Sequence, residues 1–293
     1  MSLNLLFMPK RGVTANLALH FRQETDGNAT LLDICTQEPP LRVVRGFMNT
    51  EGEALVHLHN LSGGVLGGDQ LGLSIHVGTN AKAQVTSTGS TRLYRHRHGE
   101  CNALQQTTIN VAAGGMLEYL PDTLIPFAGS RYRQCTKIAL AENAGLFYWE
   151  IITPGREALG ELFHYEWLRL DLDICAGGRP IAGERVQLEP TSRPLSSLMR
   201  LGQFRYFTTF YVCCVGVAAS NWLTLEAALD ACAAEQSVPD ETLWGVSTLS
   251  AHGLVIRGLG MNSRTLQHGL LCFWQVAKRE LYGREAIMPR KIY

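Results

Sequence analysis

Alternation of apolar and polar residues is the feature that most restricts how this 293-residue chain can fold. Leu71, Leu73, Ile75 and Val77 are separated by small or polar residues. Residues 167–174 alternate in the same way, with leucine or isoleucine at every second position. Because side chains on one face of a β-strand recur every two residues, both segments predict strands with one buried face.

Turn-forming residues separate these and other short apolar runs between residues 17 and 188. Glycine, asparagine and aspartate cluster at 26–28, 113–115, 142–145 and 177–180. Many short strands between such turns, without helical periodicity, predict a mainly β fold: a sandwich, a barrel or a solenoid. No sequence repeat of fixed period is present, so spacing alone does not favour a regular solenoid.

The last third of the chain predicts helices. Thr224 is expected to cap a first helix, and Ser263 a second helix that ends at Gly283. Apolar residues recur at helical spacing in the second helix: Leu266, Leu270, Phe273, Trp274, Ala277 and Leu281. A strand pair is expected between the helices, around 244–249 and 254–256. Because no linker-like composition divides the chain, we expect a single domain over 1–293, with its helical portion within about 224–282.

Charge and cysteine content restrict the class of protein. Lys+Arg and Asp+Glu both number 26, so nothing favours nucleic acid or an anionic membrane as the main partner. The apolar run 206–223 could span a bilayer by length, but its aromatic and β-branched residues also fit a buried strand, which we expect. The eight cysteines form no CxxC motif, and the N-terminal apolar stretch is too short for a signal peptide. We therefore expect a cytoplasmic protein with free thiols.

A glycine-rich loop lies between two predicted strands. Gly63, Gly64, Gly67 and Gly68 fall within six residues and are followed by Asp69. Such a loop predicts positive φ angles or a close backbone approach. It has no Lys-Ser/Thr sequence and is therefore not a phosphate-binding P-loop. Taken alone, it also fits an ordinary structural turn.

Two histidine pairs are candidate metal ligands: His57 with His59, and His96 with His98. Imidazole is a good ligand for nickel, copper and zinc. A closed site needs about four organised ligands, and no others stand at a recognisable spacing. Surface-facing polar strand segments are therefore the alternative interpretation.

Five carboxylates are candidates for acid–base chemistry or cation binding: Asp69, Glu118, Asp122, Glu150 and Glu161. Two carboxylates facing one cleft could hydrolyse glycosidic bonds. Glu150 stands among aromatic residues, which predicts burial and a raised pKa. The alternative is that these side chains are hydrogen-bonded structural carboxylates. No GxSxG or HExxH motif is present.

Several short motifs together resemble the UreD family of urease accessory proteins, called UreH in some bacteria. They are Gly63–Asp69, Leu120-Pro121-Asp122, Pro126-Phe127 with Ser130-Arg131, Gly155-Arg156 with Gly160-Glu161, and Pro289-Arg290. The resemblance extends roughly from Gly46 to Tyr293. The chain departs from the family pattern at Thr86-Ser87-Thr88-Gly89, where a Thr-Thr-Gln-like run is common, and at its Lys291-Ile292-Tyr293 ending, where Ile-Trp is usual.

The resemblance implies a non-enzymatic factor that matures the nickel enzyme urease. The implied fold is a right-handed, β-helix-like stack of many short strands with two α-helices in the C-terminal third. The implied partners are a helical accessory protein (UreF), a GTPase (UreG) recruited through it, and apo-urease, whose active-site lysine becomes carbamylated.

The resemblance also implies a path for nickel. Nickel is in transit and no cofactor is tightly bound. It would pass through an internal tunnel, for which the five carboxylates above are the candidate lining.

The second predicted helix suggests a site for the helical accessory protein. Its apolar arc is wide enough to bury more than one face. We therefore expect part of it to pack on the β core and part to contact the accessory protein. The stripe is formed by Leu266, Leu270, Phe273, Trp274 and Leu281.

Two other functions stay open at this point. A β-fold hydrolase with paired carboxylates would turn over glycans. A stand-alone metal-storage protein would bind nickel tightly by itself.

Overall fold

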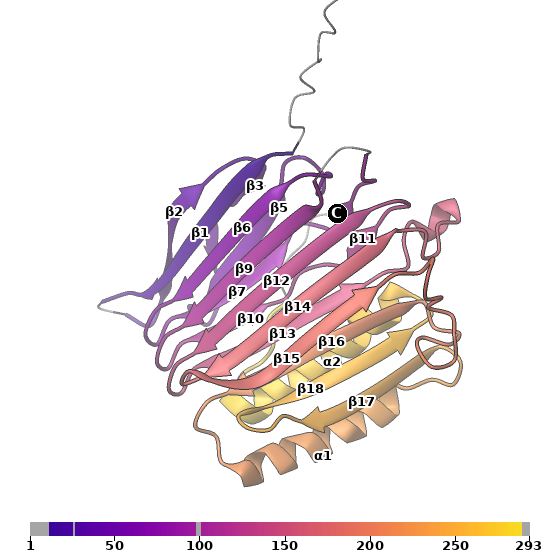
Figure 1. Ribbon diagram of the computed structural model, residues 1–293. Coiled ribbons are helices and arrows are strands. Elements are labelled where there is room, and N and C mark those ends of the chain that lie inside the picture. The colour runs from indigo at the N-terminus through magenta and orange to yellow at the C-terminus, as the bar shows by residue number, and fades with distance from the viewer. Residues whose placement is uncertain (1–11, 26, 98–100, 289–293) are drawn as a thin grey trace, which may run out of the picture.

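The computed structural model describes residues 12–25, 27–97 and 101–288; the terminal Pro289-Arg290 motif lies outside these ranges. The described residues form eighteen β-strands, two α-helices and one short 3-10 helix, which confirms the mainly β prediction. Two sheets stack on each other, and the helices cover the outer face of one of them (Figure 1).

The first sheet has seven strands in the order β15-β14-β12-β9-β6-β1-β2. Its five central strands are parallel, and the two edge strands pair antiparallel with their neighbours. The strands are β1 (Thr14–Gln23), β2 (Thr30–Gln37), β6 (Gln70–Val77), β9 (Ala103–Val111), β12 (Arg131–Leu140), β14 (Trp167–Ala176) and β15 (Arg179–Leu188). The alternating segments found in the sequence are β6 and β14.

The second sheet follows the order β17-β18-β16-β13-β10-β7-β5-β3, with β4, β8 and β11 attached beside this path. Strands β5, β7, β10 and β13 are parallel, and β16, β18 and β17 continue the sheet antiparallel. The strands are β3 (Leu41–Arg42), β4 (Gly46–Met48), β5 (Ala54–Asn60), β7 (Lys82–Ser87), β8 (Thr91–Leu93), β10 (Met116–Tyr119), β11 (Leu124–Pro126), β13 (Gly145–Ile152), β16 (Tyr206–Cys214), β17 (Thr242–Thr248) and β18 (Gly253–Gly260).

Successive long strands alternate between the two sheets, so the two ends of the sandwich differ. At one end, here called the turn end, four strands of the first sheet (β6, β9, β12 and β14) pass into the next strand through the tight turns 78–81, 112–115, 141–144 and 177–178. At the other, the loop end, the connections are longer: 61–69, 88–102, 120–130, 153–166 and 189–205. These loop-end connections contain β8, β11 and the 3-10 helix η1 (Glu157–Leu159).

Apolar side chains fill both spaces between the layers. One cluster lies between the sheets and includes Phe21, Ile75 and Leu146. A second cluster lies between the second sheet and the helices α1 (Ala219–Gln236) and α2 (Ser263–Tyr282). Within the described residues, neither helix is both long and apolar enough to cross a bilayer.

The helix boundaries correct two sequence predictions. Helix α1 begins at Ala219 after an Ala218 N-cap, not after Thr224. The boundary is not visible in the sequence because the apolar run 206–223 contains both β16, in its first half, and the first turn of α1, at its end. Helix α2 is capped by Asn262, one residue before the predicted Ser263, and the Asn262 Oδ1 atom accepts from the Thr265 amide at 3.0 Å.

Candidate functional site

The space between the two sheets changes character along the strands. On β12 the inward-facing residues Tyr132, Gln134 and Thr136 precede Ile138 and Leu140. On β9 the inward-facing Gln105 and Thr107 lie between Ala103 and the apolar pair Ile109 and Val111. The interior therefore has a polar band across the middle of β9 and β12, with one apolar cluster toward the turn end and another toward the loop end.

Glu150 lies in this polar band. On β13, Leu146 and Tyr148 belong to the core between the sheets, and Glu150 faces the same way. The Tyr148 hydroxyl donates to Glu150 Oε1 at 2.7 Å, and Gln134 Nε2 donates to the same oxygen. Gln134 lies on β12 of the first sheet, where its Oε1 atom accepts from the Tyr132 hydroxyl at 3.2 Å. Burial raises the pKa of Glu150, as the sequence predicted, although both hydrogen bonds oppose that rise.

Three adjoining cavities lie in the space between the sheets. The central cavity, of about 50 Å³, is lined by Glu150 and is large enough for a water molecule. A cavity of about 220 Å³ shares Gln105 and Tyr119 with it and reaches the glycine loop. A third cavity shares Glu150 and extends to Glu184 on β15. The cavities therefore follow the space between the sheets from the glycine loop to the edge strand β15.

Glu184 is a carboxylate of this region that was not expected from the sequence. The Tyr211 hydroxyl donates to its Oε2 atom at 2.7 Å, and Arg257 lies 3.3 Å from its Oε1 atom. Glu184 and Glu150 line one cavity from opposite sheets. The available signal was the position of Glu184 between Ala182 and Val186, which both pack inward from β15.

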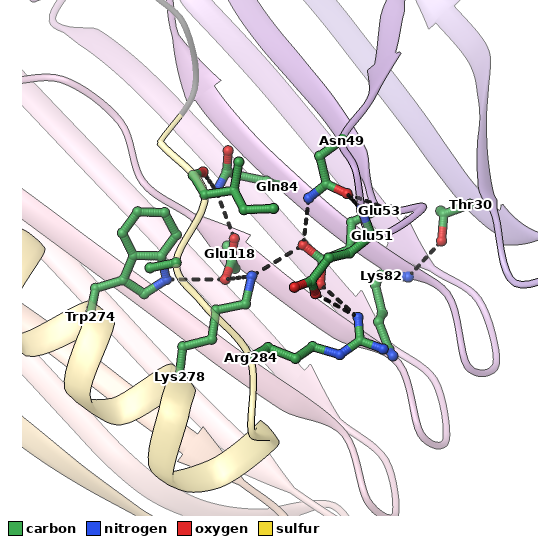
Figure 2. A network of polar contacts seen from close by, with 12 residues as sticks. Thr30, Asn49, Glu51, Glu53, Lys82, Gln84, Glu118, Trp274, Lys278 and Arg284 are labelled. Carbon is green, nitrogen blue, oxygen red and sulfur yellow. Dashed lines mark hydrogen bonds and ion pairs between the residues drawn. The ribbon is translucent and has the colours of Figure 1, made fainter.

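Glu118 lies on the other face of the second sheet, toward α2 (Figure 2). Lys278 Nζ lies 2.9 Å from Glu118 and 3.1 Å from Glu53, and the exposed fractions of these three side chains are 0%, 0% and 1%. Trp274 Nε1 donates to Glu118 at 3.0 Å, and Gln84 Nε2 donates to it at 2.7 Å. The carboxylate is thus fully paired away from the three cavities.

The charges of this buried network depend on each other. Burial raises the pKa of Glu118, and the nearby Lys278 ammonium opposes the rise. Burial alone would lower the pKa of Lys278, but Glu118 and Glu53 outweigh it, so that pKa is raised and the ammonium stays charged. Arg284 adds a second cation, 3.3 Å from Glu53 and 3.1 Å from Glu51. The network fastens α2 and the residues after it to the start of β5.

Asp69 is also a structural carboxylate. Its Oδ1 atom accepts from the Val13 amide at 3.0 Å, and its Oδ2 atom accepts from the Leu66 amide at 2.9 Å. The side chain is buried. It holds the glycine loop against the chain that enters β1.

The glycine loop has the backbone features predicted for it. Gly63 and Gly68 have φ angles of +73° and +87°. A Cβ atom on Gly64 would lie 2.4 Å from the Arg92 carbonyl oxygen, so only glycine fits there. Gly67 is buried. The loop forms part of the wall of the larger cavity through Gly63 and Gly64.

The two remaining carboxylates lie at the loop end. Asp122 lines the central cavity, and its amide donates to Ser87 Oγ at 2.8 Å. Glu161 forms an ion pair with Arg156, which lowers the pKa of Glu161. The structure thus brings Asp122 and Glu150 to one cavity and places Asp69, Glu118 and Glu161 elsewhere.

The apolar stripe of α2 is packed inside the chain. Leu266, Leu270 and Phe273 have exposed fractions of 0%, and Trp274 of 1%. Leu281 is partly buried against the same cluster. The four fully buried side chains are therefore inaccessible to a partner in this conformation.

The histidines are dispersed. His57 and His59 both lie on β5, and His59 lines the larger cavity. His96 follows β8, and His98 lies outside the described residues. Over the described ranges, no group of three or more histidine, cysteine, aspartate and glutamate side chains is placed to hold a metal ion.

Comparison with known proteins gives consistent matches over nearly the whole chain. A family model described as UreD urease accessory protein matches residues 13–292. A urease accessory protein UreD of Herpetosiphon aurantiacus is 50% identical over 278 residues, which are 95% of this chain and 96% of that protein. The UreD protein of Nitrosococcus oceani is 35% identical over 86% of this chain and 81% of that protein. The UreD protein of Pseudomonas aeruginosa is 32% identical over 86% of this chain and 85% of that protein.

Proposed function

The chain belongs to the UreD family of urease accessory proteins, and from this membership we propose that it is a non-catalytic scaffold subunit for urease maturation. The proposed partners are a UreF-type helical accessory protein, a UreG-type GTPase that joins through the complex, and apo-urease. Nickel is the cargo, and the proposed location is the cytoplasm.

The observation that carries the nickel-transfer proposal is the run of adjoining cavities between the sheets, whose walls include carboxylates. Glu150, Glu184 and Asp122 line these cavities with carboxylate oxygens. Oxygen ligands suit nickel less well than imidazole or thiolate. Weak sites in series favour passage, because conduction requires that each site also release its ion. Asp69, Glu118 and Glu161 are left out of the path because none of them lines these three cavities.

The alternation of strands between the two sheets supports a finer proposal about the fold. We take it to be the right-handed, β-helix-like stack that the family resemblance implies, within a single domain. A crystal structure of the isolated chain tests both the handedness and the domain organisation.

The alternative functions have less support. Glu118 and Glu150 face opposite sides of one sheet, so they do not form a carboxylate pair in one cleft. Glu150 and Glu184 do share a cavity, but that cavity is only about 10 Å³ in volume, which has no room for a sugar ring. A storage role would need tight ligands, whereas the cavity carboxylates are oxygen donors.

A charge-removing variant tests the path. Glu150→Gln keeps the side-chain volume and removes the carboxylate, and Glu142→Gln is the matched control on an exposed turn. Each variant is mixed with the accessory proteins and apo-urease, and complex formation, urease nickel content and the rate of activation are measured. We expect Glu150→Gln to assemble normally but to load nickel more slowly, and Glu142→Gln to behave as wild type. Wild-type loading by Glu150→Gln would remove Glu150 from the path, and a chain that binds no partner would overturn the scaffold role.

A further inference from the structure

The connection between β15 and β16, residues 189–205, holds two adjacent large apolar side chains in solvent. The exposed fraction is 92% for Leu198 and 93% for Met199, the highest values among the exposed large apolar residues of the described chain. Single exposed apolar residues are ordinary on protein surfaces. An adjacent and almost fully exposed pair needs a physical explanation.

The backbone around this pair is held in place. Leu195 is 3% exposed and packs in the same apolar cluster as Tyr165, and Leu201 packs against that cluster. The Leu201 amide donates to the Leu195 carbonyl at 3.1 Å, and the Gly202 amide donates to the Ser197 carbonyl at 3.0 Å. Leu195 and Leu201 thus anchor both sides of the segment. The exposure of Leu198 and Met199 therefore belongs to a compact, hydrogen-bonded loop.

The net charge of the connection is positive. The connection contains three arginines, Arg193, Arg200 and Arg205, against one glutamate, Glu189. Arg193 and Arg200 are exposed beside the pair, and the Arg200 guanidinium donates to the Arg193 carbonyl. Arg205 is paired with Glu157. Residues 193–200 therefore carry two exposed arginines and no carboxylate.

We propose that residues 193–200 are a docking tip that inserts Leu198 and Met199 into an apolar pocket with an acidic rim on a protein partner. This inference rests on the proposed function, which supplies the two candidate partners, apo-urease and the UreF-type accessory protein. Charge complementarity selects a pocket with carboxylates at its edge. Methionine suits such a contact because its flexible thioether adapts to the partner surface. The tip projects from the loop end, where the larger cavity reaches the glycine loop.

The test measures the affinity of the full chain for each purified probe, apo-urease and the UreF-type protein. Burial of a leucine- or methionine-sized side chain changes an equilibrium constant by roughly tenfold or more. We expect Leu198→Ser with Met199→Ser to raise the Kd for one probe by at least about tenfold. The matched control is Leu223→Ser, which changes a leucine that is 62% exposed on α1 and should leave both affinities unchanged. Arg193→Glu with Arg200→Glu should lower the association rate for the same probe and weaken its salt dependence.

The outcomes separate this inference from the proposed function. Circular dichroism and the thermal midpoint should not change in the double variant, because its substituted side chains lie in solvent. Wild-type affinity of the double variant for both probes overturns the docking tip and leaves the scaffold role intact. An equal loss in Leu223→Ser also overturns it. If the double variant keeps its affinity for both proteins and loses only the binding of the wild-type chain to phosphatidylserine vesicles, the tip binds a membrane surface and not a protein. Failure of the wild-type chain to bind either probe refutes both proposals.

Discussion

Replacement of Lys278 by methionine would remove the buried cation that Glu53 and Glu118 share and would keep an unbranched side chain of similar length. Glu53 would retain two partners, Arg284 at 3.3 Å and Asn49 at 2.8 Å. Glu118 would retain only N–H donors, from Gln84 and Trp274. The substitution therefore leaves one fully buried carboxylate without a countercharge.

Loss of one partner from a buried ion pair destabilises a protein by about 3–5 kcal/mol. The two N–H donors that remain on Glu118 favour the lower end, so we expect the free energy of unfolding to fall by about 3 kcal/mol. Domains are usually stable by about 5–15 kcal/mol, so the variant should still fold at low temperature. Urea unfolding followed by circular dichroism measures the change.

The loss should depend on pH. Burial raises the pKa of Glu118, and removal of Lys278 takes away the charge that opposes the rise. A carboxyl group whose folded-state pKa exceeds its unfolded value destabilises the fold most above the folded pKa, and the effect disappears as the pH falls to the unfolded value of about 4.3. The difference in stability between wild type and variant should therefore narrow from about pH 8 to about pH 5.

Two further variants serve as controls. Adding Glu118→Gln to Lys278→Met removes the uncompensated charge and should recover part of the lost stability. Lys137→Met changes an exposed lysine on β12 and should shift stability by no more than about 0.5 kcal/mol. A loss below about 1 kcal/mol in Lys278→Met, or a difference that widens on acidification, would refute this account of the network.

Two predictions concern the glycine loop and its carboxylate, and thermal and urea unfolding check both. Gly64→Ala places a Cβ atom 2.4 Å from the Arg92 carbonyl oxygen and should cost about 1–3 kcal/mol, whereas Gly89→Ala, whose Cβ meets nothing within 4 Å, should be close to neutral. Equal stability of the two variants would contradict the close approach. Asp69→Ala leaves two backbone amides without their acceptor and should lower the free energy of unfolding by at least about 1–3 kcal/mol. Asp69→Asn should lower it less. An unchanged free energy in Asp69→Ala would show that water replaces the carboxylate.

Local patterns in the sequence predicted the strands well. Strands β6 and β14 each have one face buried between the sheets, and that burial produces the alternation read at 71–77 and 167–174. The pair β17 and β18 and the end of α2 at Gly283 were also predicted correctly, because turn and cap residues act over a few neighbours. The start of α1 was wrong because Ala218 gives no side-chain cap and β16 precedes it in the same apolar run.

The buried network could not be predicted, because it depends on contacts between distant parts of the chain. Lys278 and Glu53 are 225 residues apart, and Trp274 and Glu118 are 156 apart. Lys278 stands four residues after Trp274, on the same face of α2, but a lysine in the last turns of a helix is ordinarily exposed. Only the packing of that helix on the second sheet explains why a lysine is buried there.

The polar residues between the sheets could be predicted in part. Residues Gln105, Gln134 and Glu150 each occupy an inward position of a strand, so the register of each strand could have revealed them. Their meeting depends on how strands from two sheets face each other, which no single segment specifies. The sequence could therefore suggest Glu150 as an unusual residue but not its neighbours.

The late position of α2 in the chain has a consequence for synthesis on the ribosome. The strands that carry Glu118 and Phe210 are made first, and their outer face is not fully covered until α2 is complete. A nascent chain that stops before α2 therefore lacks Lys278, so Glu53 and Glu118 have no ammonium partner from α2 and lie next to a wide apolar surface. Such surfaces are where chaperones bind and where aggregation begins. Completion of α2 therefore removes the surface at which chaperone binding and aggregation could begin.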